Sequence, residues 1–272
     1  MHDKVPSSMT QTRVYGSPPH SVAVVHGGPG AAGEMAPVAR ELSDEFGVIE
    51  PLQSAKSVEG QIGELASAVA EHCATPVSMV GYSWGAWLAC LTASRYPERI
   101  RNLILVSAGP FEERYADDIT KTRLARLSFD DRAEFDMLIA VLNNVSRGEK
   151  DTVFARIGAL FSKADTFDPV EDHDSNDMEC RADIFEAVWP EAAELRRNGQ
   201  LLEAAGTITC PVLAIHGEYD PHPAAGVRDP LSAALQNFRF ILLPYCGHTP
   251  WMEHAARDDF FHILRKELRL HR

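Results

Sequence analysis

The chain has 272 residues, of which 45% are hydrophobic and 24% are charged, and its formal net charge at pH 7 is −13. This size suits one large domain, or a core domain with an insertion. The negative charge argues against nucleic acids and anionic membranes as partners, because both are polyanions.

Residues 1–11 are polar and are predicted to form a loose tail rather than a secretion signal. No stretch of the chain approaches the ~20 consecutive apolar residues that a membrane-spanning helix requires. The five cysteines are scattered and lack Cys-x-x-Cys spacing. We therefore expect reduced thiols in a cytoplasmic protein, with neither a disulfide framework nor a metal site.

Between residues 12 and 108, short apolar runs alternate with amphipathic segments. The predicted strands cover 21–25, 46–49, 77–80 and 100–106, and the predicted helices cover 31–43, 58–73 and 86–95. The first strand ends at the sequence His-Gly-Gly-Pro-Gly at 26–30, which must form a loop.

The alternation stops at Gly109-Pro110. Residues 109–206 are predicted to be mostly helical, and they carry 22 acidic against 12 basic side chains, a balance of −10. The alternation then resumes, with strands predicted at 211–216 and 238–243 and helices at 225–235 and 255–268.

Repeated alternation of strands and helices predicts an α/β fold with a doubly wound, mostly parallel sheet and helices on both of its faces. The core would comprise residues 12–108 and 207–272. The helical segment 109–206 would be a lid inserted at one end of the sheet.

The sequence Gly-Tyr-Ser-Trp-Gly at 81–85 links the strand predicted at 77–80 to the helix predicted at 86–95. A serine between two glycines at such a turn is held in a strained backbone conformation, with its hydroxyl clear of the sheet. A substrate carbonyl can reach the hydroxyl there, so Ser83 is the predicted nucleophile.

A serine nucleophile needs a general base, and the base needs an anion to orient it. His248 follows the last predicted strand, at the edge of a parallel sheet where ligands bind. Asp220 follows the strand before it, and its loop position leaves room for the imidazole. The chain order Ser83, Asp220, His248 is the order expected of serine hydrolases built on such a sheet.

Other residues at strand ends compete for these roles. His26 and His216 also end strands, but we assign His26 to hydrogen bonds within its loop and His216 to packing beside the next turn. Glu218 is the alternative for the acid. A metal site formed by His216, Asp220 and His222 is a less favoured hypothesis.

A tetrahedral intermediate needs hydrogen-bond donors for its oxyanion. The backbone N–H of Trp84, at the start of a helix, is one predicted donor. The second is expected from Gly28, with Gly27 next, because glycine lets a backbone N–H approach a substrate closely.

Aromatic residues near the predicted mouth of the site indicate a partly apolar substrate pocket. The predicted substrate contacts are Gly27, Tyr82, Phe111, Trp189 and Trp251. An acidic lid would also attract a cationic amine, although acidic surfaces are commonly just solvated. The candidate lid carboxylates are Glu171, Asp172, Asp174 and Glu186.

These motifs resemble the α/β-hydrolase superfamily, and the pair His-Gly-Gly-Pro-Gly and Gly-x-Ser-Trp-Gly resembles its prolyl iminopeptidase branch. The resemblance covers about residues 20–108 and 207–270. It implies an α/β-hydrolase fold and amide or ester hydrolysis through an acyl-enzyme, without a cofactor. Iminopeptidases of this branch carry an Asp-x-Arg-Gly-x-Gly-type loop after the second core strand, where this chain has a shorter stretch at 50–54.

Three functional hypotheses follow. The first is a serine hydrolase of the prolyl iminopeptidase type, acting on small molecules or short peptides. The second is a carboxylesterase-like acyl hydrolase with an apolar substrate. The third, from another class, is a non-catalytic member of the fold that binds a ligand or a partner protein.

Overall fold

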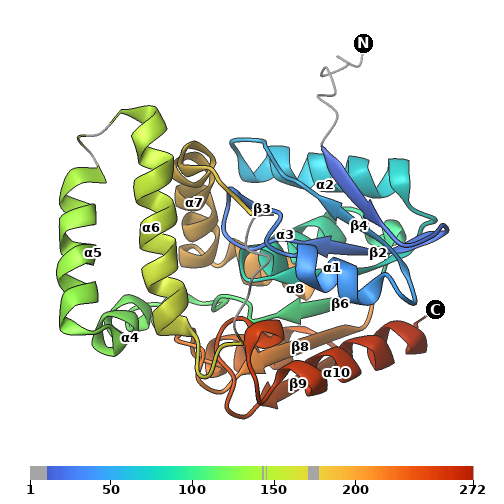
Figure 1. The fold of residues 1–272 in the computed structure, drawn as a ribbon. Coiled ribbons are helices and arrows are strands. Elements are labelled where there is room, and N and C mark those ends of the chain that lie inside the picture. The colour runs from blue at the N-terminus through green and yellow to red at the C-terminus, as the bar shows by residue number, and fades with distance from the viewer. Residues whose placement is uncertain (1–10, 143, 145, 171–177, 272) are drawn as a thin grey trace.

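The computed structural model describes residues 11–142, 144, 146–170 and 178–271, and Figure 1 shows a central sheet with a helical block beside it. The strands are β1 (Thr12–Tyr15), β2 (His20–Val25), β3 (Ala31–Ala32), β4 (Gly47–Pro51), β5 (Val77–Tyr82), β6 (Ile100–Val106), β7 (Glu179–Cys180), β8 (Val212–Gly217) and β9 (Phe238–Leu243). The α-helices are α1 (Ala36–Leu42), α2 (Val58–His72), α3 (Trp84–Arg95), α4 (Ile119–Arg126), α5 (Phe129–Leu142), α6 (Arg147–Asp165), α7 (Ala182–Arg197), α8 (Gln200–Gly206), α9 (Ala225–Ala234) and α10 (Arg257–Leu270).

The main sheet has 7 strands in the order β1-β4-β2-β5-β6-β8-β9. Strand β1 pairs antiparallel with β4, and the other pairings within this sheet are parallel. The predicted α/β fold with a mostly parallel sheet is therefore confirmed. Parallel strands end at a common edge, which brings the loops after β2, β5, β8 and β9 together.

Successive residues of a strand point to opposite faces of the sheet. On β2, Ala23 and Val25 pack on the side of helices α2 and α3, and Val22 and Val24 pack on the side of α1 and α10. Both faces bury apolar surface, which explains why the central strands are continuous apolar runs. Among the described residues, no helix has both the length and the apolar character needed to cross a membrane.

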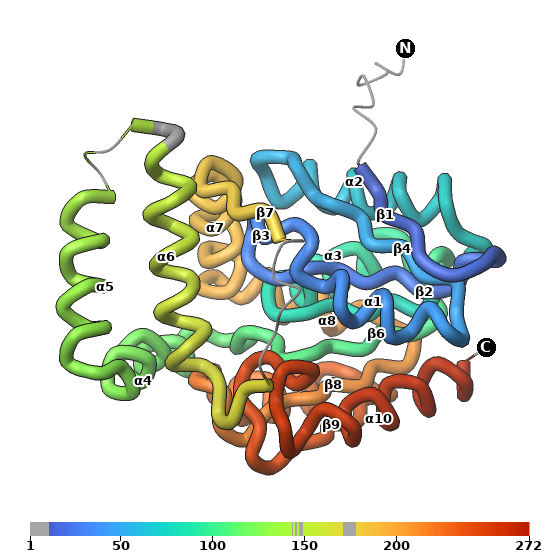
Figure 2. The backbone as a smooth tube through the Cα atoms, viewed as in Figure 1, coloured from blue at the N-terminus to red at the C-terminus, as the bar shows by residue number. Residues whose placement is uncertain are grey.

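Between β6 and β8 the chain leaves the sheet and forms a helical insertion, as expected for residues 109–206 (Figure 1). Helices α4 to α7 of this insertion are called the lid below, and α8 follows them. A short antiparallel ladder joins this lid to the core, because β3 pairs with β7 through Ala31 and Cys180. The two strands lie side by side in Figure 2. The Arg181 N–H adds a 2.8 Å bond to the Gly30 carbonyl oxygen. The lid is thus held directly against the glycine-rich loop.

The segment after the glycine-rich loop differs from its prediction. A helix is expected over 31–43, but α1 begins only at Ala36. Gly33 has φ +90°, which is outside the helical region, and Pro37 lies in the first turn of the helix, where its missing N–H costs nothing. Residues 31–32 form β3 instead, with a partner strand far along the chain that no local pattern reveals.

Candidate active site

Ser83 occupies the tight turn between β5 and α3. Its φ of 52° and ψ of −115° are strained for a residue that carries a Cβ. A Cβ at Gly81 would lie 2.3 Å from the Gly85 carbonyl oxygen, and one at Gly85 would lie 2.3 Å from the Val25 carbonyl oxygen. Both positions therefore require glycine, and the sharp turn presents the Ser83 side chain at the edge of the sheet.

Ser83, Asp220 and His248 lie together at the ends of β5, β8 and β9. His248 Nε2 is 3.1 Å from Ser83 Oγ, and His248 Nδ1 is 2.7 Å from Asp220 Oδ2. Because an ionised carboxylate only accepts, His248 donates its Nδ1–H to Asp220, which leaves Nε2 to accept the serine proton. The arrangement is that of a nucleophile, a base and an orienting anion.

Burial and neighbouring charges shift the pKa values of Asp220 and His248 in opposite directions. Burial disfavours the charged form of Asp220, but attraction to His248, His222 and His216 holds the pKa of the carboxyl well below its usual value. Burial also lowers the pKa of His248, but the Asp220 carboxylate outweighs it and raises this pKa above its ordinary 6.5. Asp220 therefore stabilises the imidazolium that forms when His248 accepts a proton.

Asp220 also holds a second imidazole. His222 Nδ1 is 2.8 Å from Asp220 Oδ1, and the His222 backbone N–H donates to the same oxygen at 2.9 Å. Burial lowers the pKa of His222 to about 4, so this ring is neutral at pH 7. Each oxygen of Asp220 thus has its own histidine, which fixes the plane of the carboxylate beside His248.

Asp220, His222 and His248 are also a group of described residues whose potential metal-ligand atoms lie within 4.8 Å of one another. The sequence-based hypothesis for a metal site named His216 in place of His248. Both Nδ1 atoms in the group already face the carboxylate. A metal ion here would displace their protons and break the contact that orients His248, so the arrangement suits proton transfer better than metal binding.

The competing residues have other partners. His26 Nδ1 lies 2.8 Å from the carbonyl oxygen of the next residue, and its Nε2 accepts the Gln53 N–H at 3.3 Å. His216 Nε2 lies 2.8 Å from the His222 carbonyl oxygen. Glu218, the alternative acid, is exposed. These contacts are consistent with the hydrogen-bonding role expected of His26 in its loop and with the place expected of His216 beside the next turn.

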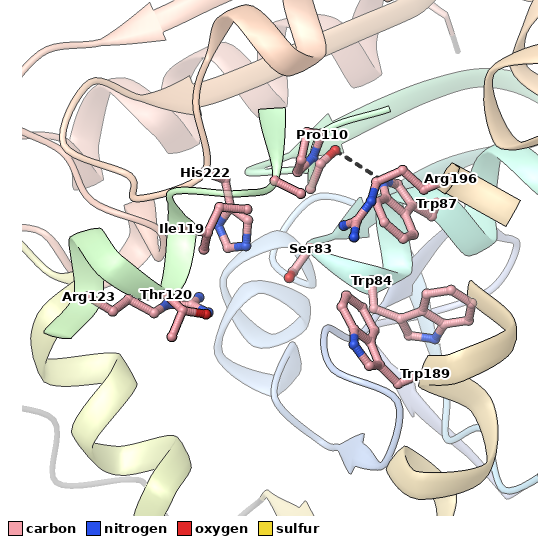
Figure 3. Close-up of a pocket in the computed structure, with 12 residues that line it drawn as sticks. Ser83, Trp84, Trp87, Pro110, Ile119, Thr120, Arg123, Trp189, Arg196 and His222 are labelled. Carbon is pink, nitrogen blue, oxygen red and sulfur yellow. Dashed lines mark hydrogen bonds between the residues drawn. The ribbon is translucent and has the colours of Figure 1, made fainter. Parts of the chain in front are cut away.

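A cavity of about 270 Å³ lies beside Ser83. Figure 3 shows Ser83 pointing toward its middle, with His222 and Arg123 on one side and Trp189 and Arg196 on the other. The residues come from the core loops, from the core helix α3 and from lid helices α4 and α7. A substrate in this cavity would therefore touch both the core and the lid.

Three tryptophans form one apolar wall of this cavity, and Pro110, Ala116 and Ile119 add further apolar surface. Trp87 donates its Nε1–H to the Gly109 carbonyl oxygen at 3.0 Å (dashed line in Figure 3). Trp84 donates its own Nε1–H to Gln61 Oε1 at 3.0 Å. Trp189 stacks on Trp87, with ring centroids 6.0 Å apart and an interplanar angle of 6°. These contacts keep the apolar wall in a fixed shape.

A second cavity, of about 460 Å³, lies between the glycine-rich loop and lid helices α6 and α7. Gly28, a predicted oxyanion donor, lines this cavity, whereas Trp84, the other predicted donor, lines the first. Glu34 also lines the second cavity, and burial raises the pKa of this carboxyl to about 7 against the attraction of His248. No pattern in the amino-acid sequence pointed to Glu34.

The predicted substrate contacts divide into two groups. Trp189 lines the first cavity and Trp251 lines the second. Phe111 is fully buried, Tyr82 is 3% exposed, and neither they nor Gly27 line either cavity. Contact with substrate is not supported for Tyr82 and Phe111, because their side chains pack within the core. Gly27 is buried beside Glu34 and Tyr82.

The acidic-lid hypothesis finds no support among the described residues. Glu186 is exposed, lines neither cavity, and pairs with Lys150 at 2.7 Å. The other three candidate carboxylates, Glu171, Asp172 and Asp174, lie outside the described residues.

Glu253 fixes the loop that carries His248, although no sequence pattern pointed to it. Its buried carboxylate accepts the backbone N–H groups of Gly247 at 2.7 Å, Phe167 at 2.8 Å and Asp168 at 2.7 Å. The His248 N–H itself bonds at 2.8 Å to a carbonyl oxygen at the end of α6. One carboxylate therefore ties the loop that carries His248 to the segment after α6.

Replacing Glu253 with glutamine is expected to lower the free energy of unfolding by about 2–4 kcal/mol. The amide loses the negative charge and turns an N–H₂ group toward backbone donors. Urea denaturation monitored by fluorescence measures the loss. Glu203, which is exposed on α8, gives the matched control, and Glu203→Gln should change stability by less than about 0.5 kcal/mol. Equal stabilities for the two variants would contradict this role of Glu253.

Comparisons with known proteins agree with this architecture. The family model described as "Alpha/beta hydrolase family" matches residues 22–260. The chain is 25% identical over 197 residues to a pimeloyl-[acyl-carrier protein] methyl ester esterase of Nitrosomonas europaea, covering 70% of this chain and 71% of the relative. It is 26% identical over 211 residues to the protein of the same name in Chromobacterium violaceum, covering 75% and 74%.

Among solved structures, the crystal structure of VinJ superposes with a TM-score of 0.67 at 18% identity, covering 98% of both chains. At this identity the likeness concerns the fold alone. The relatives found by sequence are named as esterases, and the prolyl iminopeptidase branch expected from the motifs is not confirmed. Because the family match spans most of the sequence, this protein belongs to the alpha/beta hydrolase family.

Proposed function

We propose that this protein is a serine esterase that hydrolyses small carboxylic esters through an acyl-enzyme formed on Ser83. The observation that carries the proposal is the unbroken hydrogen-bonded line from Asp220 through His248 to Ser83, with distances of 2.7 and 3.1 Å. The cavity beside Ser83 gives the substrate carbonyl a place to bind.

In the first half of the reaction, His248 Nε2 takes the Ser83 proton while Oγ attacks the ester carbonyl. The backbone N–H groups of Trp84 and Gly28 would stabilise the oxyanion that develops. His248 then gives its proton to the leaving alcohol, and the acyl group stays on Ser83. In the second half, His248 activates a water molecule that attacks the acyl-enzyme and releases the acid.

Ester cleavage is favoured over the aminopeptidase activity first expected. The curated relatives that match most of the chain are named as esterases. An aminopeptidase needs an anion for the free amine of its substrate, and the described part of the lid presents arginines, not carboxylates, to the cavity beside Ser83. The alternative of a silent ligand-binding protein is opposed by the geometry of Ser83, His248 and Asp220, which is ready for proton transfer.

A substrate panel is expected to separate these functions. The wild-type protein should hydrolyse p-nitrophenyl acetate and butyrate with saturation kinetics, and it should leave proline and alanine p-nitroanilides intact. A fluorophosphonate should label Ser83, as mass spectrometry of the digested protein would show. Turnover of the aminoacyl anilides without ester turnover would restore the aminopeptidase hypothesis. A protein that neither turns over esters nor forms a Ser83 adduct would be a binding protein.

A further inference from the structure

The charged side chains that line the cavity beside Ser83 are opposite in sign to the net charge of the protein. The chain carries a net charge of −13, yet the charged side chains that line this cavity, among the described residues, are Arg123 and Arg196. Histidine 222 contributes a neutral ring, since its pKa is lowered to about 4 by burial. Whether either arginine can attract a negative group of a ligand depends on how far its own carboxylate partner satisfies it.

Arg123 is already satisfied by the protein. Its Nε and Nη2 atoms donate to both carboxylate oxygens of Asp165 at 2.6–3.0 Å. The side chains are 17% and 7% exposed, so this is a shielded, bidentate ion pair. Arg123 thus holds α4 against the end of α6 and has little charge left for a ligand.

Arg196 is satisfied only in part. Its Nε donates to Glu113 Oε2 at 2.7 Å, and its two terminal Nη groups make no hydrogen bond to any described residue. The Arg196 side chain is 10% exposed, whereas Glu113 is 44% exposed and its charge is screened by water. The guanidinium also packs 5.6 Å from the centre of a Trp87 ring. Two preorganised N–H₂ groups therefore remain for a ligand.

We propose that Arg196 binds a carboxylate of the substrate, so that the preferred esters carry a free carboxylate a few bonds from the ester. This role of Arg196 rests on the proposed ester hydrolysis and defines the class of ester that the protein would prefer. Figure 3 shows the Arg196 guanidinium reaching toward the middle of the cavity into which Ser83 points. The volume of about 270 Å³ suits a short molecule, and the tryptophan wall suits the methylene groups between its two polar ends.

Binding to the Ser83→Ala variant tests the proposal without requiring turnover. Monomethyl adipate and methyl hexanoate have acyl chains of equal length, and only the first carries a carboxylate. Isothermal titration should show that monomethyl adipate binds about 10- to 100-fold more tightly, because it gains a charge-assisted bond. A second pair, the acetate ester of 4-hydroxybutanoate and butyl acetate, tests whether the carboxylate belongs to the alcohol part instead. A preference in either pair supports the proposal.

Substitutions of the ion pair should move this preference in opposite directions. In the Ser83→Ala background, Arg196→Gln should abolish it and Arg196→Lys should retain part of it, since lysine keeps the charge without the planar fork. Glu113→Gln should increase the preference, because it removes the competing carboxylate. A purely structural role for the pair would make Arg196→Gln and Glu113→Gln act alike. Arg197→Gln, on the same helix but outside the cavity, is the control and should leave the ratio unchanged.

Equal affinity for the charged and neutral members of both pairs would overturn the proposal. So would a preference for the carboxylate that survives Arg196→Gln. These outcomes are distinct from failure of the proposed function, which would appear as absence of turnover of every ester by the wild-type protein. If no ester were turned over but the carboxylate preference were measured, Arg196 would belong to a ligand-binding site. Only the esterase proposal would then be refuted.

Discussion

Replacing Ser83 with alanine is expected to lower kcat/KM for p-nitrophenyl esters by about 10⁴- to 10⁶-fold, as loss of a triad member does in other serine hydrolases. In the proposed mechanism the Oγ atom forms the covalent bond to the acyl group, and no other described hydroxyl lies within hydrogen-bond distance of His248 Nε2. The fold should survive, because alanine keeps the Cβ and removes one oxygen. We expect the free energy of unfolding to change by less than about 1 kcal/mol.

Ser107 provides a matched control for this prediction. It directly follows the neighbouring strand β6, has a φ of 46° and is buried, but it lines neither cavity. Ser107→Ala should therefore keep wild-type turnover and a Ser83 adduct with fluorophosphonate. Steady-state kinetics on both variants, with circular dichroism to verify folding, is the measurement. A Ser83→Ala protein with a rate within about tenfold of wild type would refute the acyl-enzyme mechanism.

The residues that a local motif specifies could be predicted from the sequence. A Cβ atom at position 81 or 85 would lie less than 3 Å from neighbouring backbone atoms, so both positions require glycine. This steric requirement explains why the serine turn can be recognised in the sequence. Asp220 and His248 were expected because parallel strands bring their ends to one edge. Few other residues at strand ends could act as acid or base, so the choice was narrow. The structure places Asp220 and His248 within hydrogen-bond distance of each other, and His248 within hydrogen-bond distance of Ser83.

The residues that complete the site could not be predicted in this way. Arg196 reaches the cavity from a lid helix, and its orientation depends on packing against Trp87 and Glu113, which are distant in the sequence. Glu253 acts on backbone N–H groups, which leave no trace in side-chain patterns. Phe111 was expected at the pocket because aromatic side chains line pockets and cores alike, and here the core holds it.

The charge of the lid also could not be interpreted correctly from the sequence alone. A balance of −10 over residues 109–206 suggested an anionic site for amines. The acidic side chains of the described lid are largely exposed or paired with basic neighbours, whereas two arginines turn inward. Net charge averages over a surface, but recognition depends on the few groups that face the substrate. Only the three-dimensional arrangement shows which charged side chains of the lid face the cavity and which face the solvent.

Replacing Asp220 with asparagine is expected to lower kcat/KM by about 10⁴-fold and also to change its pH dependence. An asparagine can offer an N–H where His248 Nδ1 needs an acceptor, which favours the wrong tautomer of the imidazole. In the mechanism proposed for the wild-type protein, His248 must be neutral to accept the Ser83 proton. Because its pKa is raised above 6.5, activity should fall as the pH is lowered through a value above 6.5.

In Asp220→Asn, the attraction that raises the His248 pKa is lost while the burial that lowers it remains. The residual activity should therefore persist to lower pH than in the wild-type protein, so the acid limb of the kcat/KM profile moves to lower pH. Glu218→Gln, at the exposed alternative acid, should leave both rate and profile unchanged. An unshifted acid limb in Asp220→Asn would show that another group titrates there, and Asp220 would then not be the anion that sets the basicity of His248.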